Sequence, residues 1–296
     1  MPELPEVEVV RRGIQRHFIG SDIADVQVLA ERSVRDHDAG SDEFRQLLLG
    51  RTLASVERRG KFMWLRLGDS DSALVIHLGM SGQVLAQTSL ADLPVHARVV
   101  LRLRARVASN SRPRTSTPPH LVFVDQRMFG RMFVDGLTDT PQRTLPVSAL
   151  HIAADPLEPA FDCAEVVRRI RARTAGIKSV LLNQQVVSGI GNIYADEALW
   201  RARVHWANPA CEVSPAKVEK TLEAAATVMA EALKAGGTSF DSMYVNVNGS
   251  SGYFSRELNA YGREGEPCRR CESLIVREKF ENRSAFRCPR CQRRGR

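Results

Sequence analysis

Four cysteines near the C-terminus have the spacing of a metal site. Cys268 and Cys271 form one Cys-x2-Cys pair, and Cys288 and Cys291 form a second pair after sixteen intervening residues. Four thiolates in this pattern bind one tetrahedral Zn²⁺ and leave no open position for catalysis. Disulfides are the alternative, but the composition indicates a cytosolic protein and the intervening loop has hairpin length. We therefore predict one structural zinc and no organic cofactor.

The same C-terminal segment concentrates the positive charge of the chain. Residues 268–296 contain ten Lys and Arg against three Glu, which is +7 of the formal net charge of +8. A basic bias that only aids solubility is the simpler interpretation, but it does not explain this placement. Charge gathered in one small module is typical of a phosphate-binding surface.

Hydrophobic periodicity predicts the elements that position these residues. Apolar residues recur at helical spacing over 7–18, behind Pro5, which suits a first helical turn. From 52 to 136, short apolar or alternating runs are separated by Gly, Asp and Ser, as in a sandwich or barrel. Residues 274–287 alternate around an Asn-Arg turn, which predicts a β-hairpin with Arg283 at or near its tip.

Helical patterns follow a Pro-rich, weakly periodic stretch that predicts a linker. We expect helices at 163–173, 177–184, 192–202 and 215–234. The last of these begins with Ser214 as N-cap and Pro215 at its first position, and it ends at Gly236–Gly237.

The sequence GIGNIY places Gly189 and Gly191 just before one of these helices. It lacks the third glycine and the preceding strand of a dinucleotide site, so that interpretation is weak. A glycine turn before a helix N-terminus can instead hold a backbone phosphate.

Seven motifs, in order, resemble the bacterial formamidopyrimidine-DNA glycosylase family, also called the Fpg/Nei family. They are PELPEVE, LGMSG, RMFGRM, IGNIYADE, GGT, GYF and the zinc hairpin. The resemblance runs nearly end to end and implies an α+β multidomain fold. It assigns a catalytic β-sandwich with an N-terminal helix, a linker, a helix–two-turn–helix domain with a lesion-capping loop, and a zinc-finger β-hairpin. Their expected ranges are 1–138, 139–160, 161–255 (loop 238–253) and 256–296.

The resemblance gives the N-terminus a chemical role. Once Met1 is removed, Pro2 carries a free α-amine, and the usual pKa of about 7.7–8.0 leaves part of it unprotonated at neutral pH. Such an amine can attack C1′ of a damaged nucleoside, expel the base and form an iminium that promotes β- and δ-elimination. Glu3 matches the family's general acid/base residue, and Glu6 lies close enough to tune the site. The alternative is that the prolines stiffen a helix entry and the glutamates favour its N-terminus.

Further positions match family residues that assist elimination or bind phosphates. Lys61 matches a hairpin lysine that assists elimination, and Arg283 matches a zinc-finger arginine that contacts phosphate and aids δ-elimination. Lys178 and Asn192 match residues that grip the phosphates flanking the lesion. A surface charge and a helix N-cap are the structural alternatives for these two.

An extruded base leaves a gap in the duplex that something must occupy. Met80, Arg127 and Phe129 match the family's void-filling residues, with two apolar side chains in the stack and an arginine for the orphaned cytosine. In isolation, Met80 and Phe129 would more often belong to a core. His96 and Arg173 match further DNA-contacting positions.

The family has branches for oxidised purines and for oxidised pyrimidines. The long polar segment 238–253 is like the loop that caps an extruded purine, so we expect 8-oxoguanine and formamidopyrimidines as lesions. A pyrimidine-acting enzyme of the same family is one alternative. A non-catalytic zinc-containing DNA-binding protein is another, but it gives no account of Pro2 and Glu3. The Pro-rich segment at 109–119 departs from the family pattern.

The partner expected from this resemblance is damaged double-stranded DNA, bound by a monomer. No apolar run reaches about 18 residues, so we expect no membrane span. The expected location is the bacterial cytoplasm, with association to the nucleoid through DNA.

Overall fold

The computed structural model describes residues 2–68, 70–105, 119–237 and 257–295 of the 296-residue chain. They form two compact units, each with its own hydrophobic core. Unit 1 holds Pro2 and residues 6–150, and unit 2 holds residues 3–5 together with the described residues from 151 onwards. Within the described ranges, no helix is both long enough and apolar enough to cross a membrane.

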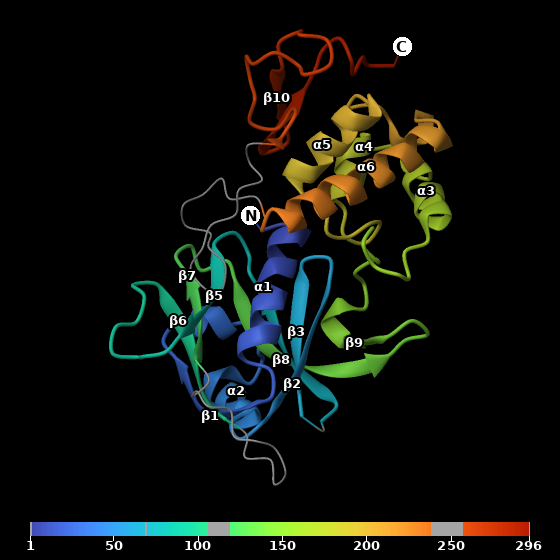
Figure 1. Cartoon of the computed structure of the whole chain (residues 1–296). Coiled ribbons are helices and arrows are strands. Elements are labelled where there is room, and N and C mark those ends of the chain that lie inside the picture. Colours follow the sequence, from blue (N-terminus) through green and yellow to red (C-terminus); the bar gives the residue numbers. More distant parts are fainter. Residues whose placement is uncertain (1, 69, 106–118, 238–256, 296) are drawn as a thin grey trace. The chain divides into compact units, whose positions relative to one another are not determined.

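Two antiparallel sheets form the body of unit 1 (Figure 1). The first has the strand order β1 (Ser21–Val28), β6 (Ala97–Ala105), β7 (His120–Asp125) and β5 (Gly82–Gln87). The second has the order β2 (Leu53–Arg59), β3 (Phe62–Leu67), β4 (Ser72–His77), β8 (Arg131–Asp139) and β9 (Thr144–Pro146). Buried side chains from both sheets share one hydrophobic core, so the predicted β-sandwich is confirmed.

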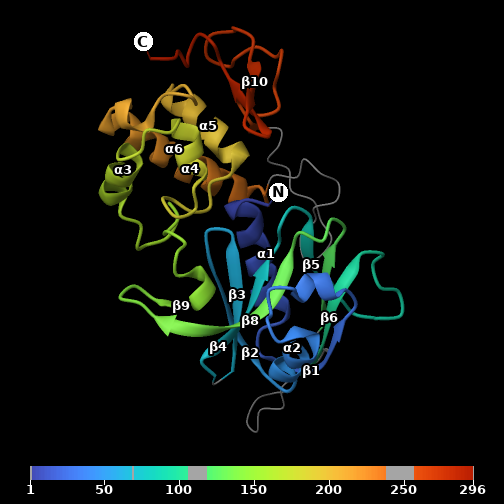
Figure 2. The same ribbon diagram turned by 180° about the vertical axis from the view of Figure 1, so that it is seen from behind.

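Two helices add apolar side chains to this core. The predicted helix behind the N-terminus is α1 (Leu4–His17), and its Val7, Val10 and Ile14 are at most 1% exposed. Helix α2 (Gly40–Leu48) lies beside β1 in Figure 2 and contributes Phe44 to the same cluster. Neither α2 nor β1 was predicted, and the unit also contains the short 3-10 helices η1 (Glu31–Val34) and η2 (Val147–Ala149).

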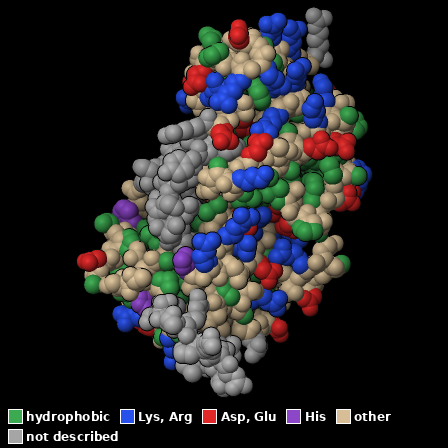
Figure 3. Space-filling model, viewed as in Figure 1, with side chains coloured by type: hydrophobic (Ala, Val, Ile, Leu, Met, Phe, Trp, Pro, Cys, Tyr) green, Lys and Arg blue, Asp and Glu red, His purple; other side chains and the backbone are tan. Residues whose placement is uncertain are grey.

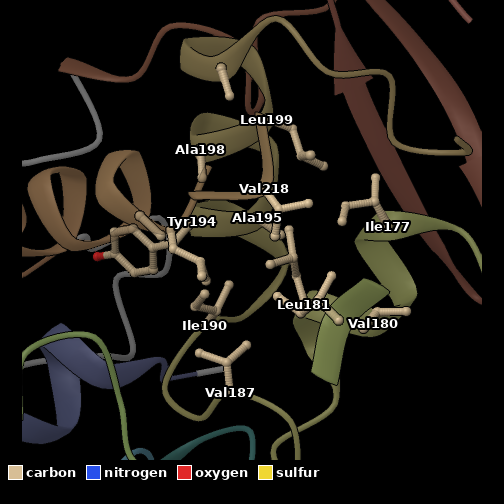
Figure 4. Close-up of a cluster of buried hydrophobic side chains, with 14 of the residues drawn as sticks. Ile177, Val180, Leu181, Val187, Ile190, Tyr194, Ala195, Ala198, Leu199 and Val218 are labelled. Atoms are coloured by element: carbon tan, nitrogen blue, oxygen red, sulfur yellow. The ribbon is translucent and has the colours of Figure 1, made fainter. Parts of the chain in front are cut away.

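The helical part of unit 2 follows the predicted pattern closely. Its elements are α3 (Cys163–Arg171), α4 (Ile177–Leu182), α5 (Asn192–Ala202), the 3-10 helix η3 (Ala210–Glu212) and α6 (Pro215–Lys234). The apolar faces of α4, α5 and α6 meet in one cluster, in which Leu181, Tyr194 and Val218 are fully buried (Figure 4). Helices α3 and α4 each end two residues before the predicted end.

The ends of α6 test the capping predictions. Ser214 occupies the N-cap position, but its side chain makes no capping hydrogen bond. At the other end, Gly236 and Gly237 have φ values of 80° and 94°, and the amide of Gly237 donates to the carbonyl of Ala232 at 2.8 Å. This is the left-handed helix ending that glycine favours.

The C-terminal part of unit 2 contains the predicted β-hairpin. Strands β10 (Val276–Phe280) and β11 (Arg283–Arg287) pair in antiparallel register, with Phe280 opposite Arg283. The turn is therefore Glu281–Asn282, one residue earlier than the predicted Asn-Arg turn, and Arg283 is the first residue of β11.

Candidate active site and zinc centre

The carboxylate of Glu3 is bound at the N-terminus of helix α5. It accepts hydrogen bonds from the backbone amides of Gly191 at 2.8 Å, Ile193 at 2.9 Å and Tyr194 at 3.4 Å, and Glu3 is only 2% exposed. The first amides of a helix lack intrahelical partners and carry partial positive charge, so they favour an ionised carboxylate. The glycine turn thus holds a carboxylate of the chain itself, and the phosphate hypothesis does not hold for these three donors.

The two glycines of this turn let the N-terminal segment approach closely. The amide of Leu4 donates to the carbonyl of Gly189 at 3.1 Å, and Gly189 has a φ of 86°. A Cβ on Gly191 would lie 2.2 Å from Cδ of Glu3, far inside any real contact. Glycine at both positions is therefore required by the seating of residues 3 and 4.

Pro2 and Lys61 both belong to unit 1 but differ in burial. Pro2 is buried and directly precedes Glu3 in the chain, while Glu6 is buried in the first turn of α1. Lys61 is half-buried in the two-residue turn Gly60–Lys61 that joins β2 and β3. The hairpin position predicted for this lysine is thus present.

His77, which the sequence analysis did not select, lies near Lys61. Its ring packs against Phe62 at a centroid distance of 5.0 Å, and its Nδ1 accepts a hydrogen bond from the amide of Gly79 at 3.2 Å. Burial lowers the pKa of His77 to about 4, helped by the charges of Arg131 and Lys61. His77 is therefore neutral near pH 7 and carries its proton on Nε2. In the sequence, His77 could have been selected only because it directly precedes the LGMSG motif.

The three predicted void-filling residues lie on two loops of unit 1. Met80 is in the β4–β5 connection, and Arg127 and Phe129 are in the β7–β8 connection. Met80 is 42% exposed and Phe129 is 48% exposed, so neither is a core residue. The loops touch at Gly79, where a Cβ would lie 2.5 Å from the backbone of Phe129 and Gly130. The structure thus brings the two loops together.

Asp125 organises the second of these loops, although the sequence analysis did not single it out. It is fully buried, and its carboxylate accepts hydrogen bonds from Ser81 Oγ at 2.5 Å, from the amide of Arg127 at 3.2 Å and from the amide of Gly130 at 2.6 Å. Its backbone amide donates to the carbonyl of His96 at 3.0 Å. Asp125 therefore fixes the backbone on both sides of the exposed side chains.

Lys178 and Asn192 make protein contacts within unit 2. Lys178 is fully buried; its Nζ lies 2.7 Å from Oδ1 of Asp196 and donates to the carbonyl of Ser284 at 3.1 Å. Asn192 Nδ2 donates to the same carbonyl at 3.1 Å. Lys178 is therefore not the exposed helix-surface charge that the sequence offered as its structural alternative.

Burial shifts the pKa values of both members of the Lys178–Asp196 ion pair. Burial lowers the pKa of Lys178, and the facing Asp196 acts against this effect. Burial also raises the pKa of Asp196 to about 7, although Lys178 and the amide of Phe286 favour the carboxylate. Each charge is thus maintained mainly by the other.

The remaining predicted DNA contacts differ in exposure. Arg283 and Arg173 are exposed, and His96 is half-buried. Arg283 lines an open depression of about 410 Å³ together with Arg277 and Lys279, and Glu264 and Glu278 lie at its wall. Figure 3 shows Lys and Arg side chains gathered on the zinc-finger part of the chain. This surface suits a polyanion.

The four predicted metal ligands converge at one point of the C-terminal module. The sulfur atoms of Cys268, Cys271, Cys288 and Cys291 all lie within 4.8 Å of one another. The Cys271–Cys288 and Cys271–Cys291 Sγ distances are 3.4 and 3.5 Å, near the roughly 3.8 Å that four Zn–S bonds of about 2.3 Å impose on a tetrahedron. The site fits a structural Zn²⁺ held by four thiolates.

The zinc site is packed on the helical part of unit 2. Trp200 of α5 lies in the same hydrophobic cluster as Cys268 and Cys288, and the guanidinium of Arg270 lies 3.6 Å from the centroid of its ring. Gln292 accepts from the amide of Cys288 and donates to the carbonyl of Val204, both at 2.9 Å. The zinc module is therefore attached to the helical part through Trp200 and Gln292.

Three family models match the chain in order. The formamidopyrimidine-DNA glycosylase N-terminal domain covers residues 1–132, the formamidopyrimidine-DNA glycosylase H2TH domain covers 152–243, and the zinc finger found in FPG and IleRS covers 265–294. The chain belongs to the formamidopyrimidine-DNA glycosylase family. The family resemblance, the predicted fold and the zinc-finger assignment are thereby confirmed.

Two relatives show how far this membership extends. A formamidopyrimidine-DNA glycosylase of Rhodococcus jostii is 52% identical over 292 residues, which are 99% of this chain and 96% of the relative. One of Acidothermus cellulolyticus is 52% identical over 293 residues, covering 99% and 97%. The similarity therefore spans all three matched regions.

Solved structures of the Lactococcus lactis family member agree with the fold. A complex with abasic-site DNA has a TM-score of 0.82 at 28% identity, covering 99% of this chain and all of the other. A variant bound to Fapy-dG DNA gives 0.84, and a complex with DNA containing an oxidised pyrimidine gives 0.82, both at 28% identity with the same coverage. The predicted domain boundaries and site roles stay predictions.

Proposed function

We propose that this chain is a bifunctional DNA glycosylase and AP lyase of base excision repair. In this proposal it excises oxidised purines through a Schiff base on Pro2 and then cleaves the strand by β- and δ-elimination. The observation that supports it best is the seating of Glu3. A carboxylate bound by three backbone amides at the N-terminus of α5 stands one residue after the amine that maturation would expose.

Each chemical step has a group that can carry it. The free secondary amine of Pro2 attacks C1′, the glycosidic bond breaks, and the base leaves with the bonding electrons and a proton. Ring opening gives an iminium, whose positive nitrogen draws electrons as C2′ loses a proton and the 3′ phosphate departs. Loss of the 5′ phosphate follows in δ-elimination. Glu3 accepts and returns the protons, and Lys61 and Arg283 assist the eliminations.

We assign DNA binding to the exposed residues of both units. Met80, Phe129 and Arg127 fill the gap left by the extruded base, and Arg173 and Arg283 contact phosphates. The exposure of Met80 and Phe129, on two loops that touch at Gly79, supports this role, because both side chains are free of the core and can enter a base stack. The solved family members in complex with damaged DNA support duplex DNA as the partner.

The choice of oxidised purines rests on the polar segment 238–253 and on the relatives' name. That segment lies outside the described residues, as does most of the Pro-rich segment at 109–119. An oxidised-pyrimidine substrate remains the second candidate, since the Lactococcus lactis protein was solved with DNA of that kind.

Borohydride trapping tests the proposal directly. The mature protein is incubated with duplex DNA that carries 8-oxoguanine opposite cytosine, and a covalent adduct on Pro2 is sought by peptide mass spectrometry. Pro2→Gly replaces the fixed secondary amine by a more mobile primary amine and should cripple trapping and strand cleavage while it retains DNA binding; Pro5→Ala, which leaves Pro2 intact, should trap like the wild type. An adduct on an internal lysine, or binding without any adduct, would refute the mechanism. A parallel thymine glycol duplex decides between the two lesion classes.

A further inference from the structure

The hairpin that carries Arg283 is attached to helices α4 and α5 on both sides of that residue. The carbonyl of Ser284 accepts hydrogen bonds from Lys178 and Asn192, both at 3.1 Å. In the turn before Arg283, Ser179 Oγ lies 3.0 Å from Oε1 of Glu281 and donates to it. Arg283 itself is exposed.

Asp196 is the centre of this attachment. Its Oδ1 pairs with Nζ of Lys178 at 2.7 Å, and its Oδ2 accepts from the amide of Phe286 in β11 at 2.9 Å. Asp196 is 1% exposed and Lys178 is fully buried, and Nζ of Lys178 lies 4.6 Å from the centroid of the Phe280 ring in β10. One carboxylate therefore holds β11 directly and also holds the ammonium group that binds Ser284.

The zinc site cannot supply this constraint alone. Cys288 follows the last residue of β11, so Arg283 stands five residues from the nearest metal ligand. At about 3.3 Å per residue this separation is roughly 16 Å along the strand. A two-stranded hairpin is marginally stable by itself, so its far end needs a second attachment. The contacts from α4 and α5 meet the hairpin at that end.

We propose that Asp196 is a positioning residue for Arg283. It keeps Lys178 charged in a buried site, and the pair fixes the backbone on which Arg283 meets DNA. Without the carboxylate, Lys178 is an unpaired buried charge, which is strongly unfavourable. Lys178 then loses its proton or leaves the site, and the hydrogen bond to Ser284 is lost in either case. This inference rests on the proposed lyase function.

A double-mutant cycle tests the inference. Asp196→Asn keeps the side-chain volume and an acceptor for the amide of Phe286 but removes the charge. On a preformed abasic-site duplex it should lower the ratio of δ- to β-elimination product by about tenfold, within the range expected for a displaced catalytic group. In an Arg283→Ala background the same substitution should change the ratio less than about twofold, because the residue being positioned is absent.

Glu197→Gln is the matched control, since Glu197 is equally buried on α5 but accepts hydrogen bonds from the amides of residues 259–261. It should leave the ratio unchanged. A normal ratio in Asp196→Asn, or an equal fall with and without Arg283, would overturn the positioning role.

Binding of a tetrahydrofuran abasic-analogue duplex provides a readout that needs no chemistry. Asp196→Asn should weaken this binding in the wild-type background and leave it unchanged in the Arg283→Ala background; equal weakening in both backgrounds contradicts the inference. If the wild type forms no borohydride adduct, the proposed function fails and this binding cycle still decides the role of Asp196. If Asp196→Asn does not fold, Lys178→Met should lower the product ratio in the wild-type background and change it less than about twofold in the Arg283→Ala background; an equal fall in both contradicts the inference.

Discussion

Gly191→Ala should displace Glu3 without straining the backbone. Gly191 has φ −122° and ψ −162°, which is extended backbone that any residue adopts. The added methyl group would lie 2.2 Å from Cδ and 2.5 Å from Oε1 of Glu3. These atoms end a flexible side chain, so the clash is relieved when the carboxylate leaves the N-terminus of α5.

The magnitude follows from the hydrogen bonds that Glu3 would lose. The bonds from Gly191 and Ile193, at 2.8 and 2.9 Å, are charge-assisted, and each such bond contributes about 1.5–3 kcal/mol. Because the displaced carboxylate regains water, we expect a net loss of about 2–4 kcal/mol in the free energy of unfolding. That loss corresponds to a fall in Tm of roughly 4–10 °C. If Glu3 is the general acid/base, base excision should slow by about 10²–10⁴.

Calorimetry and single-turnover excision of 8-oxoguanine measure the two effects. Gly136→Ala is the control, because a Cβ there meets only Cγ2 of Val147 at 3.9 Å, and it should leave both quantities unchanged. Adding Gly191→Ala to Glu3→Gln should slow excision little further, since both substitutions remove the same group. Normal excision by a folded Gly191→Ala variant would show that the seating of Glu3 is not needed for catalysis.

Three further predictions concern the metal, the acid limit and the exposed loops. Cys268→Ser should lose zinc, measured by elemental analysis, and with it duplex affinity; retention of both would refute the structural role. Burial acts to raise the pKa of Glu8, but the hydrogen bond from Arg11 and the charge of Arg58 outweigh it and lower the pKa from 4.5 to about 2. The stabilisation that Glu8 provides is therefore complete above pH 4.5 and is lost as the pH falls toward 2. With solvent screening we expect it to contribute about 1–2 kcal/mol to the free energy of unfolding. In Glu8→Gln, the free energy of unfolding should therefore change less with pH over this interval. Phe129→Ala should reduce excision at least tenfold with a Tm change below about 2 °C, because an exposed side chain adds little to the core; a large fall in Tm would make Phe129 structural.

The sequence predicted correctly those elements that residues close together in the chain determine. The buried face of α1 follows from apolar residues at helical spacing, and α6 is bounded by Pro215 and by two glycines of positive φ. The zinc site needed only the spacing of its cysteines. Strand β1 was missed because its pairing with β6, about 75 residues away in the chain, determines it. Helix α2 was missed although Phe44 and Leu48 have helical spacing and are both buried.

The hairpin turn shows how a distant contact moves a local prediction. The sequence predicts an Asn-Arg turn, and asparagine is a common turn residue because it tolerates positive φ. The structure instead gives Glu281 a φ of 50°, and Ser179 of α4 donates a hydrogen bond to its carboxylate. Ser179, 102 positions away in the chain, thus stabilises the observed register of the hairpin. The hairpin's own sequence gives no indication of this contact.

Two basic residues of the predicted DNA-binding set, Arg283 and Lys178, differ in their burial and in their protein contacts. Arg283 is exposed, so a DNA phosphate can reach its guanidinium from solvent. Lys178 is fully buried, and its ammonium group already bonds Asp196 and the carbonyl of Ser284. A phosphate that binds Lys178 must therefore use its remaining N–H donor or displace one of these partners. Phosphate binding by Lys178 stays a prediction, and its pairing with Asp196 adds the proposed role of holding the hairpin that carries Arg283.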